Sequence, residues 1–196
     1  MKRLFDIIAS GCGLLLLSPV FLVLAVWVKI DSEGPVFYRQ MRVGRGNKDF
    51  KLFKFRSMRV GADKKGLITI GGRDPRVTCS GYYIRKYKLD ELPQLINVFI
   101  GDMSLVGPRP EVRKYVDLYT MEQMKVLEVR PGITDMASIC YRNENELLEK
   151  VENPEAYYKE VVMQDKLQIN LEYVNNHSFI GDMELIFKTL WAVVKE

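Results

Sequence analysis

Two adjacent carboxylates, Asp90 and Glu91, are the residues of this chain best suited to chemistry, because cations surround them in the sequence. Arg85 lies five residues upstream, and Arg109 lies between two prolines that restrict the backbone on both sides of it. A planar guanidinium in a stiff loop suits bidentate phosphate binding, and Arg142 follows a further turn-rich stretch. Carboxylates repel phosphates unless a cation intervenes, and Mg²⁺ is the natural oxygen-seeking ion. The pattern indicates phosphoryl chemistry, with Asp90 and Glu91 as metal ligands.

An Asp-Glu pair also has a simpler structural interpretation. Apolar residues at helical spacing predict a helix here: Leu92, Leu95, Ile96 and Phe99. This helix should end at Gly101, and Asp90 and Glu91 would lie in its first turn, where carboxylates merely balance the helix dipole. For an isolated pair the simpler interpretation is preferred. The arginines around this pair reverse that preference.

The composition excludes several other kinds of site. A chain of 196 residues and 22.7 kDa fits one domain with room for one embellishment. Its only histidine is His177, which argues strongly against catalytic triads and histidine-rich metal sites. The three cysteines, Cys12, Cys79 and Cys140, are too scattered for a disulfide framework or a zinc knuckle. Catalysis must therefore rest on carboxylates, hydroxyls and cations.

Positive charge is concentrated in residues 35–65, where ten basic residues face two acidic ones. Residues 111–196 carry the opposite excess, with ten basic and sixteen acidic side chains. A segment this basic favours an anionic partner such as a phosphate, acidic lipid headgroups or a nucleic acid. A solvated charged face, covered by the acidic part of the chain, is the alternative interpretation.

The N-terminal segment has the composition of a membrane element. Residues 7–28 form an uncharged stretch, which as a helix would cover roughly 33 Å, the thickness of a hydrocarbon core. Pro19 near its middle predicts a bend, and the Ser18 hydroxyl can bond to a carbonyl freed there. Because basic residues flank both ends, a helix that enters, bends and leaves on one face is as well supported as a single span.

The remaining sequence predicts a helix-rich α/β fold. Short strands are expected at 36–38 and 50–58, on either side of a turn at 44–47, and residues 61–76 read as a loop. Further helical segments are expected at 111–129, 144–173 and 183–194. The last of them is amphipathic, with an apolar sector formed by Leu185, Ile186, Leu190, Trp191 and Val194. Such helices suit packing or a membrane interface.

Several motifs resemble those of the bacterial sugar transferases, which are monotopic polyprenyl-phosphate phosphoglycosyl transferases. The most specific is a long block that runs from Arg85 through Asp90-Glu91-Leu92-Pro93-Gln94 to Gly107-Pro108-Arg109-Pro110. The likeness extends over nearly the whole chain through the shorter motifs Ser18-Pro19, Lys54-Phe55-Arg56-Ser57-Met58, Asp74-Pro75-Arg76-Val77-Thr78 and Arg130-Pro131-Gly132-Ile133-Thr134. The length matches a minimal member of the family.

This resemblance implies an Mg²⁺-dependent enzyme that moves a phosphosugar from a UDP-sugar to undecaprenyl phosphate and releases UMP, the first membrane step of surface glycan or glycoconjugate assembly. Asp90 matches the nucleophile, which carries the phosphosugar as an aspartyl intermediate. Glu91 matches its partner, assigned to Mg²⁺ or to proton handling. Arg85, Arg109 and Arg142 match cations around the substrate phosphates, and Lys54 or Arg56 is a weaker candidate for the same role.

The resemblance also implies an arrangement at the membrane. Residues 1–30 match a re-entrant helix-break-helix, broken at Ser18 and Pro19, and residues 31–196 match a compact catalytic domain with short strands and interfacial amphipathic helices. The protein is expected on the cytosolic face of the bacterial inner membrane, in contact with membrane lipids. The resemblance implies no nucleic-acid partner and is compatible with a homodimer.

One stretch departs from the family pattern. Many relatives continue after residues 130–134 with Gly-Leu-Ala and an Asn-Gly-Arg-Asn-like turn, whereas residues 135–145 here differ, although Arg142 still aligns. The identity of the sugar and the pathway therefore stay open. Two other hypotheses are a membrane-anchored module that binds anionic lipid or nucleic acid through residues 35–65, and a conventional single-pass anchor protein.

Overall fold

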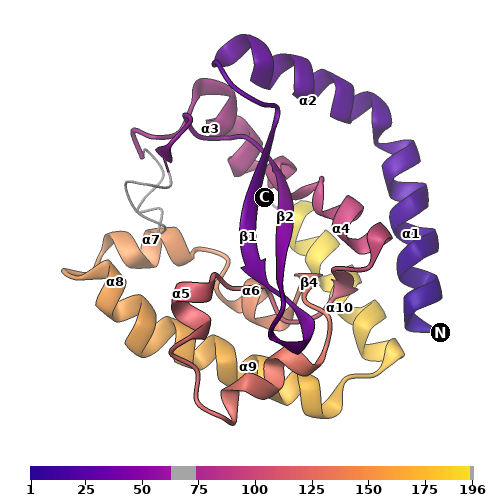
Figure 1. Ribbon diagram of the computed structural model, residues 1–196, viewed down its shortest axis with the longest axis vertical. Helices are drawn as coiled ribbons and strands as arrows, with labels where there is room; N and C mark the ends of the chain where they lie inside the picture. The colour runs from indigo at the N-terminus through magenta and orange to yellow at the C-terminus, as the bar shows by residue number, and fades with distance from the viewer. Residues whose placement is uncertain (63–73, 195–196) are drawn as a thin grey trace.

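The computed structural model describes residues 1–62 and 74–194, so that much of the predicted loop at 61–76 lies outside the described residues. Its architecture confirms a helix-rich α/β fold with two small sheets (Figure 1). In the first half the elements are α1 (Lys2–Leu16), α2 (Ser18–Asp31), β1 (Phe37–Val43), η1 (Arg45–Asn47), β2 (Asp49–Phe55), α3 (Cys79–Lys86), η3 (Leu89–Glu91) and α4 (Gln94–Ile100). They are followed by β3 (Ser104–Val106), α5 (Arg113–Val116), η4 (Gln123–Glu128), β4 (Gly132–Thr134), α6 (Met136–Cys140), α7 (Glu144–Glu149), α8 (Pro154–Tyr157), η5 (Tyr158–Val162), α9 (Met163–Asn176) and α10 (Phe179–Val194).

Helices α1 and α2 form an arc along the top and right of the molecule in Figure 1, with a bend of 60° between them. The predicted break is confirmed, because Pro19 lies in the first turn of α2. The Ser18 hydroxyl donates a hydrogen bond to the Leu15 carbonyl oxygen at 2.8 Å. This bond satisfies a carbonyl that the proline leaves without its helical partner.

The first sheet is the antiparallel hairpin of β1 and β2, in which Phe37 pairs with Phe55 and Val43 with Asp49. Both predicted strands are present, although β1 is longer than the sequence indicated. The tip of the hairpin is η1, where Gly46 adopts a positive φ of 67°. A glycine at this position avoids the steric strain that a side chain would introduce.

The second sheet is a parallel pair of two short strands, β3 and β4, with Ser104 opposite Gly132 and Val106 opposite Thr134. The backbone that follows β3 packs directly against the start of β4 and the residues just before it. A Cβ atom on Gly107 would overlap the carbonyl oxygen of Arg130, and one on Gly132 would overlap the backbone of Gly107. Glycine is required at both positions, and the two loops are therefore held together.

The expected helix around residue 90 differs in the structure. Asp90 and Glu91 do not lie in its first turn but in the separate 3-10 turn η3. Lys88 directly precedes η3 and adopts a left-handed backbone conformation with φ of 56°. Helix α4 begins afterwards at Gln94, with Pro93 immediately before it, because a proline has no N–H to lose at a helix start. The predicted end at Gly101 is confirmed, with φ of 104°.

The helical segments of the second half are also more broken than predicted. Between 111 and 129 only α5 and η4 form, and Thr120 and Gln123 exchange side-chain hydrogen bonds to each other's backbone N–H that start a new turn. The segment 144–173 is interrupted before α8, where Asn153 caps the helix that Pro154 begins. Helix α10 starts four residues earlier than the predicted 183.

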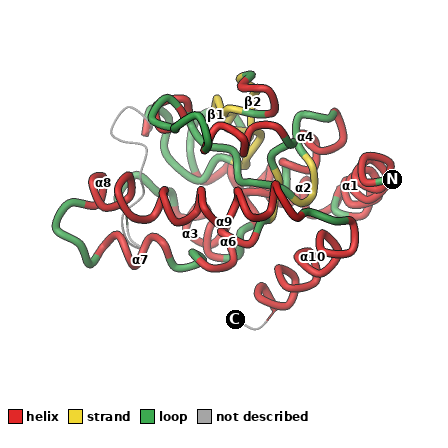
Figure 2. The backbone as a smooth tube through the Cα atoms, turned by 90° about the horizontal axis from the view of Figure 1, so that it is seen from below, coloured by secondary structure: helices red, strands yellow, loops and turns green. Residues whose placement is uncertain are grey.

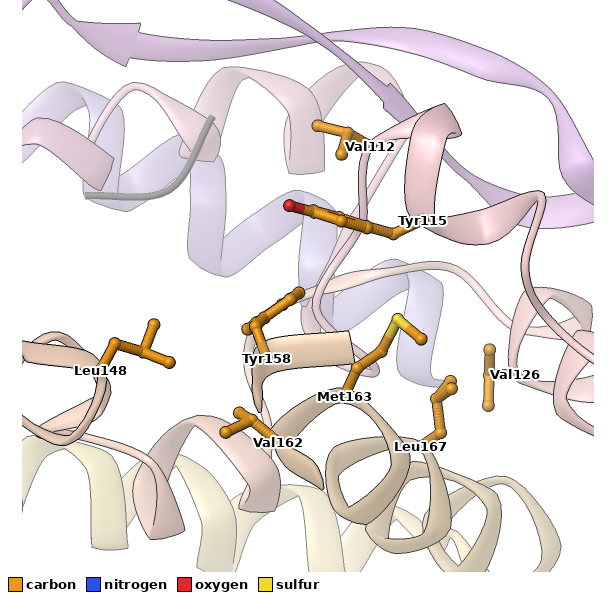
Figure 3. Close-up of a cluster of buried hydrophobic side chains, with 8 residues drawn as sticks. All are labelled: Val112, Tyr115, Val126, Leu148, Tyr158, Val162, Met163 and Leu167. Carbon is orange, nitrogen blue, oxygen red and sulfur yellow. The ribbon is translucent and has the colours of Figure 1, made fainter. Parts of the chain in front are cut away.

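The core contains three clusters of buried apolar side chains. The largest, shown in Figure 3, joins α5, η4, α7, η5 and α9 through Val112, Tyr115, Val126, Leu148, Tyr158, Val162, Met163 and Leu167. A second cluster packs α2 and α3 against the hairpin around Leu24, Val28, Phe55 and Ile84. Helix α10 leaves the end of α9 on the side of the molecule where α1 lies (Figure 2), and Phe5 contacts Phe179 there edge to face.

Candidate active site

Glu91 is the centre of a compact charged cluster. Its carboxylate accepts a two-pronged contact from the Arg109 guanidinium, with Nη1 at 3.1 Å from Oε2 and Nη2 on Oε1. Lys54, on β2, donates to Oε1 at 3.2 Å. Burial alone would raise the pKa of Glu91, but Arg109 and Lys54 outweigh it and hold that pKa well below 4.5. Glu91 is therefore an anion whose charge is already balanced by two cations.

Asp90 has a different environment from its neighbour, although only one residue separates them. Its side chain is 6% exposed, and within the described residues its carboxylate accepts no hydrogen bond. Burial raises the pKa of Asp90 above 3.8, while the nearby positive charges of Lys54 and Arg85 act in the opposite direction. The cluster thus contains one carboxylate, Glu91, that is paired with two cations, and one, Asp90, whose oxygens accept no hydrogen bond from the described residues.

The loop that carries Arg109 is fixed at several points. It follows β3 and packs through Gly107 against the loop before β4. On its other side Arg42 donates to the carbonyl oxygen of Pro110 and to the Glu111 carboxylate, both at 3.0 Å. The prolines on either side of Arg109 restrict its backbone further. A guanidinium held in this way loses little freedom when it binds an anion.

Lys54 is positioned by the packing of β2 against α4. Asn97 on α4 is fully buried and bonds to the strand on both sides of Leu52. Its Oδ1 accepts from the Phe53 N–H at 2.9 Å, and its Nδ2 donates to the Lys51 carbonyl oxygen at 2.8 Å. Burial lowers the pKa of Lys54 below 10.5, with Glu91 and Asp90 opposing that effect.

The other predicted phosphate-binding residues lie in three different places. Arg85, near the end of α3, is close enough to Asp90 to act on its pKa. Arg142 is half-buried in the turn before α7, outside the Glu91 cluster. Arg56 is buried at the end of α2, where its guanidinium donates to the carbonyl oxygens of Val28, Ser32 and Glu33. The structure thus brings Asp90, Glu91, Lys54 and Arg109 together, with Arg85 close by.

Residues 1–196 match the model of a protein family described as "Bacterial sugar transferase". This chain belongs to that family. Relatives include the UDP-N-acetylgalactosamine-undecaprenyl-phosphate N-acetylgalactosaminephosphotransferase of Aeromonas hydrophila, 38% identical over 99% of this chain and 44% of the relative. The UDP-glucose:undecaprenyl-phosphate glucose-1-phosphate transferase of Escherichia coli K12 is 38% identical over 97% of this chain and 39% of the relative.

The chain spans about two fifths of the length of these two relatives. A third relative is nearer in length. The exopolysaccharide production protein ExoY of Rhizobium meliloti is 36% identical over 98% of this chain and 84% of the relative. The similarity in each case covers the segment from residue 85 to residue 110, which carries Asp90, Glu91 and Arg109 of the charged cluster.

Two residues that act on the charged cluster were not singled out from the sequence. Lys88 lies at the entry to η3, and its positive charge acts on both Asp90 and Glu91. Asp135 directly follows β4 and is buried, and it acts on the pKa of Arg109. Its carboxylate caps α6 by accepting from the backbone and the hydroxyl of Ser138. The sequence did offer a signal for Asp135: it directly follows the motif at residues 130–134 and is the first residue of the stretch 135–145, which departs from the family pattern.

The cluster suits a magnesium ion of the kind that phosphate chemistry uses. The described residues hold no group of three or more His, Cys, Asp or Glu side chains placed to share a metal. Mg²⁺ often takes only one or two carboxylates, with substrate phosphates and water completing its shell. Asp90 offers open oxygens for this purpose, whereas the oxygens of Glu91 already face Arg109 and Lys54. The fit therefore rests first on Asp90.

Apolar side chains cover the outer face of the N-terminal helix pair. The strongly exposed ones on α1 and α2 include Leu4, Ile8, Leu15, Leu16, Leu22, Val23 and Ile30. Among the described residues no one helix has the length and apolarity to cross a membrane, but the bent pair α1–α2 has both when taken together. On the inner face of α1, the buried Asp6 accepts from the Leu105 N–H at 3.1 Å and ties the helix to β3.

Proposed function

We propose that this protein transfers a phosphosugar from a UDP-sugar to undecaprenyl phosphate and releases UMP. The relatives whose names state this type of reaction match almost the whole chain. The observation that carries the proposal is the contrast between Asp90 and Glu91: an open carboxylate lies beside one that holds two cations in place. This is the arrangement that a carboxylate nucleophile needs in order to approach a diphosphate.

In the first step the Asp90 carboxylate attacks the sugar-bearing phosphorus of the UDP-sugar. A bond forms between an Asp90 oxygen and that phosphorus, and the bond from phosphorus to the bridging oxygen breaks, so that UMP leaves. In the second step a phosphate oxygen of undecaprenyl phosphate attacks the same phosphorus. The bond to Asp90 then breaks, which yields undecaprenyl-diphosphate-sugar and regenerates the carboxylate. Splitting the reaction in this way lets the soluble and the membrane-held substrate react in turn.

The surrounding residues lower the electrostatic barrier to both attacks. A carboxylate and a diphosphate repel one another, and the cations of Arg109, Lys54 and Arg85 offset that repulsion. Glu91 keeps Arg109 and Lys54 in position before the substrate arrives. Magnesium, held first by Asp90 because Arg109 and Lys54 already engage the Glu91 oxygens, would further screen the phosphate charge.

The membrane location is part of the same proposal. The bent α1–α2 pair, with its exposed apolar face, fits a re-entrant hairpin that enters and leaves on the cytosolic face of the bacterial inner membrane. Helix α10 also exposes large apolar side chains, among them Ile180, Phe187 and Trp191, as an interfacial helix does. The side chains of Leu190 and Val194, which belong to its predicted apolar sector, lie outside the description.

The proposal is tested by assaying UMP release from a panel of UDP-sugars with undecaprenyl phosphate and Mg²⁺ present. Asp90→Asn should reduce the rate by about a thousandfold or more, because an amide cannot act as the nucleophile. Asp117→Asn is the matched control, since this exposed aspartate lies outside the cluster. Intact-mass analysis of protein trapped during turnover should find the added mass of the phosphosugar, and peptide mapping should place it on residue 90; turnover without that added mass would rule out the covalent route.

A further inference from the structure

A second charged region lies around a cavity of about 200 Å³ that is separate from the carboxylate cluster. It forms where the start of α1 meets β3 and the segment before β4. Four cations line it: Lys2, Arg3, Arg45 and Arg130. None of Asp90, Glu91, Lys54 or Arg109 lines this cavity. The space suffices for several water molecules or one small polyatomic anion.

The three arginines of this cavity are held by backbone carbonyl oxygens. Within the described chain none of them forms a salt bridge to a carboxylate. The hydrogen bonds are Arg3 to Val98 at 2.6 Å and to Phe99 at 2.9 Å, Arg45 Nε to Glu128 at 2.9 Å, and Arg130 Nε to Gly101 at 3.0 Å. A carbonyl fixes the direction of a guanidinium but leaves its full positive charge available to a ligand.

The other polar groups at the cavity do not cancel this charge. Lys2 is neutralised by Asp182 at 2.6 Å. Two carboxylates, Asp6 and Glu128, also line the cavity. Asp6 faces the Leu105 N–H, and Glu128 is exposed to solvent. Three arginines against these two carboxylates leave the cavity positive overall.

Ser104 gives an independent sign that a ligand belongs here. This residue lines the cavity and is 1% exposed, yet its hydroxyl has no hydrogen-bond partner among the described residues. A buried hydroxyl without a partner is unfavourable, because it has lost its hydrogen bonds to water and gained none in return. A bound oxyanion would satisfy it, because a serine hydroxyl can donate to a phosphate oxygen.

We propose that this cavity is a binding site for a phosphate group, distinct from the site of phosphosugar transfer. Arg45, Arg130 and the Ser104 hydroxyl would contact the phosphate oxygens, and Arg3 would contribute its charge. The surroundings favour a phospholipid headgroup as its source, since Leu4 next to Arg3 is 64% exposed and Ile180 of α10 is 74% exposed. A soluble phosphate compound offers the same chemistry and is distinguished by experiment.

The test uses the full chain in neutral detergent with two probes, short-chain phosphatidylglycerol and inorganic phosphate. Arg45→Gln and Arg130→Gln should each weaken phosphatidylglycerol binding roughly tenfold, since each removes a charge-assisted contact. Lys48→Gln is the matched control, because it removes the same charge from the same hairpin tip without lining the cavity. Its affinity should remain within about twofold of wild type. Ser104→Ala should weaken binding less than the arginine variants do.

The outcomes separate the two sources. Saturable binding of phosphatidylglycerol but not of inorganic phosphate identifies a headgroup, and equal binding of both identifies a soluble phosphate compound. If the Arg130 variant unfolds, Arg45→Gln decides the matter, because Arg45 is exposed and contributes little to packing. The absence of saturable binding of either probe, or equal weakening by Lys48→Gln, would overturn the proposal.

Discussion

Cations are held in two different ways at the two ends of the β1–β2 hairpin. At the open end, Lys54 and the nearby Arg109 are held by the Glu91 carboxylate. At the tip, Arg45 is held by a carbonyl oxygen, as is Arg130 beside the same cavity. Asp49 and Lys54 are five residue steps apart along β2, so the two ends lie about 17 Å apart.

The difference determines what each region can do without a ligand. A carboxylate positions a cation and neutralises it, so the Glu91 cluster is stable before substrate arrives and is ready for a diphosphate. A carbonyl positions a cation without neutralising it, so the tip of the hairpin keeps a net positive charge. The first arrangement suits turnover, in which anions must also leave, and the second suits continuous occupation by an anion.

Replacing Glu91 tests this comparison with the largest expected effect. Glu91→Gln removes the charge that holds Arg109 and Lys54, so both cations should lose their fixed positions. Because small misplacements of catalytic groups are costly, we expect UMP release to fall on the order of a hundredfold. Glu155→Gln is the matched control, since Glu155 also pairs with two cations, here Lys114 and Lys159, but lies on the surface. Similar losses in both variants would contradict the special role of the cluster.

Replacing Gly107 should have an intermediate effect on the protein, because Gly107 makes the backbone contact that holds the loop carrying Arg109 in place. A Cβ at this position would overlap the Arg130 carbonyl oxygen, so one of the two loops must move. Gly107→Ala should destabilise the fold by about 1–3 kcal/mol and lower the melting temperature by roughly 3–10 °C. Gly181→Ala on α10 is the control: its Cβ would lie 3.2 Å from the Ser178 Oγ, a side-chain atom that can move, and alanine favours a helix, so the melting temperature should change little. An unchanged melting temperature in Gly107→Ala would show that the loops are not tightly coupled.

Local chemistry made several features predictable from the sequence. Ser18 and Pro19 predicted the break between α1 and α2, and Gly101 predicted the end of α4, because each acts on its own backbone. The pairing of Glu91 with Arg109 spans 18 residues and depends on how η3 and the proline-flanked loop meet. Nothing in the intervening sequence specifies that contact. These residues were grouped by the cations that surround the Asp-Glu pair and by family resemblance, and neither of these gives the pairing.

Arg56 illustrates why periodicity does not fix the environment of a side chain. On an uninterrupted strand, Lys54 and Arg56 would point to the same face. Strand β2 ends at Phe55, however, and Arg56 turns instead to the carbonyl oxygens at the end of α2. Periodicity also predicted one long helix at 111–129. The structure has the short elements α5 and η4 there, and both contribute buried side chains to the same core, among them Tyr115 and Val126.

The smallest expected effect concerns acid, which should act on arginines held by carboxylates and not on those held by carbonyls. Hydrogen bonds from Arg76 hold the pKa of Asp74 below 3.8, so this pair stabilises the fold above that pH and ceases to do so as the pH falls. The melting temperature of Asp74→Asn should therefore lie below that of wild type at neutral pH, and the difference should shrink towards about pH 3. The corresponding difference for Arg45→Gln should not change with pH, because its partner is a carbonyl. Parallel pH dependence in the two variants would contradict the distinction between the two ways of holding an arginine.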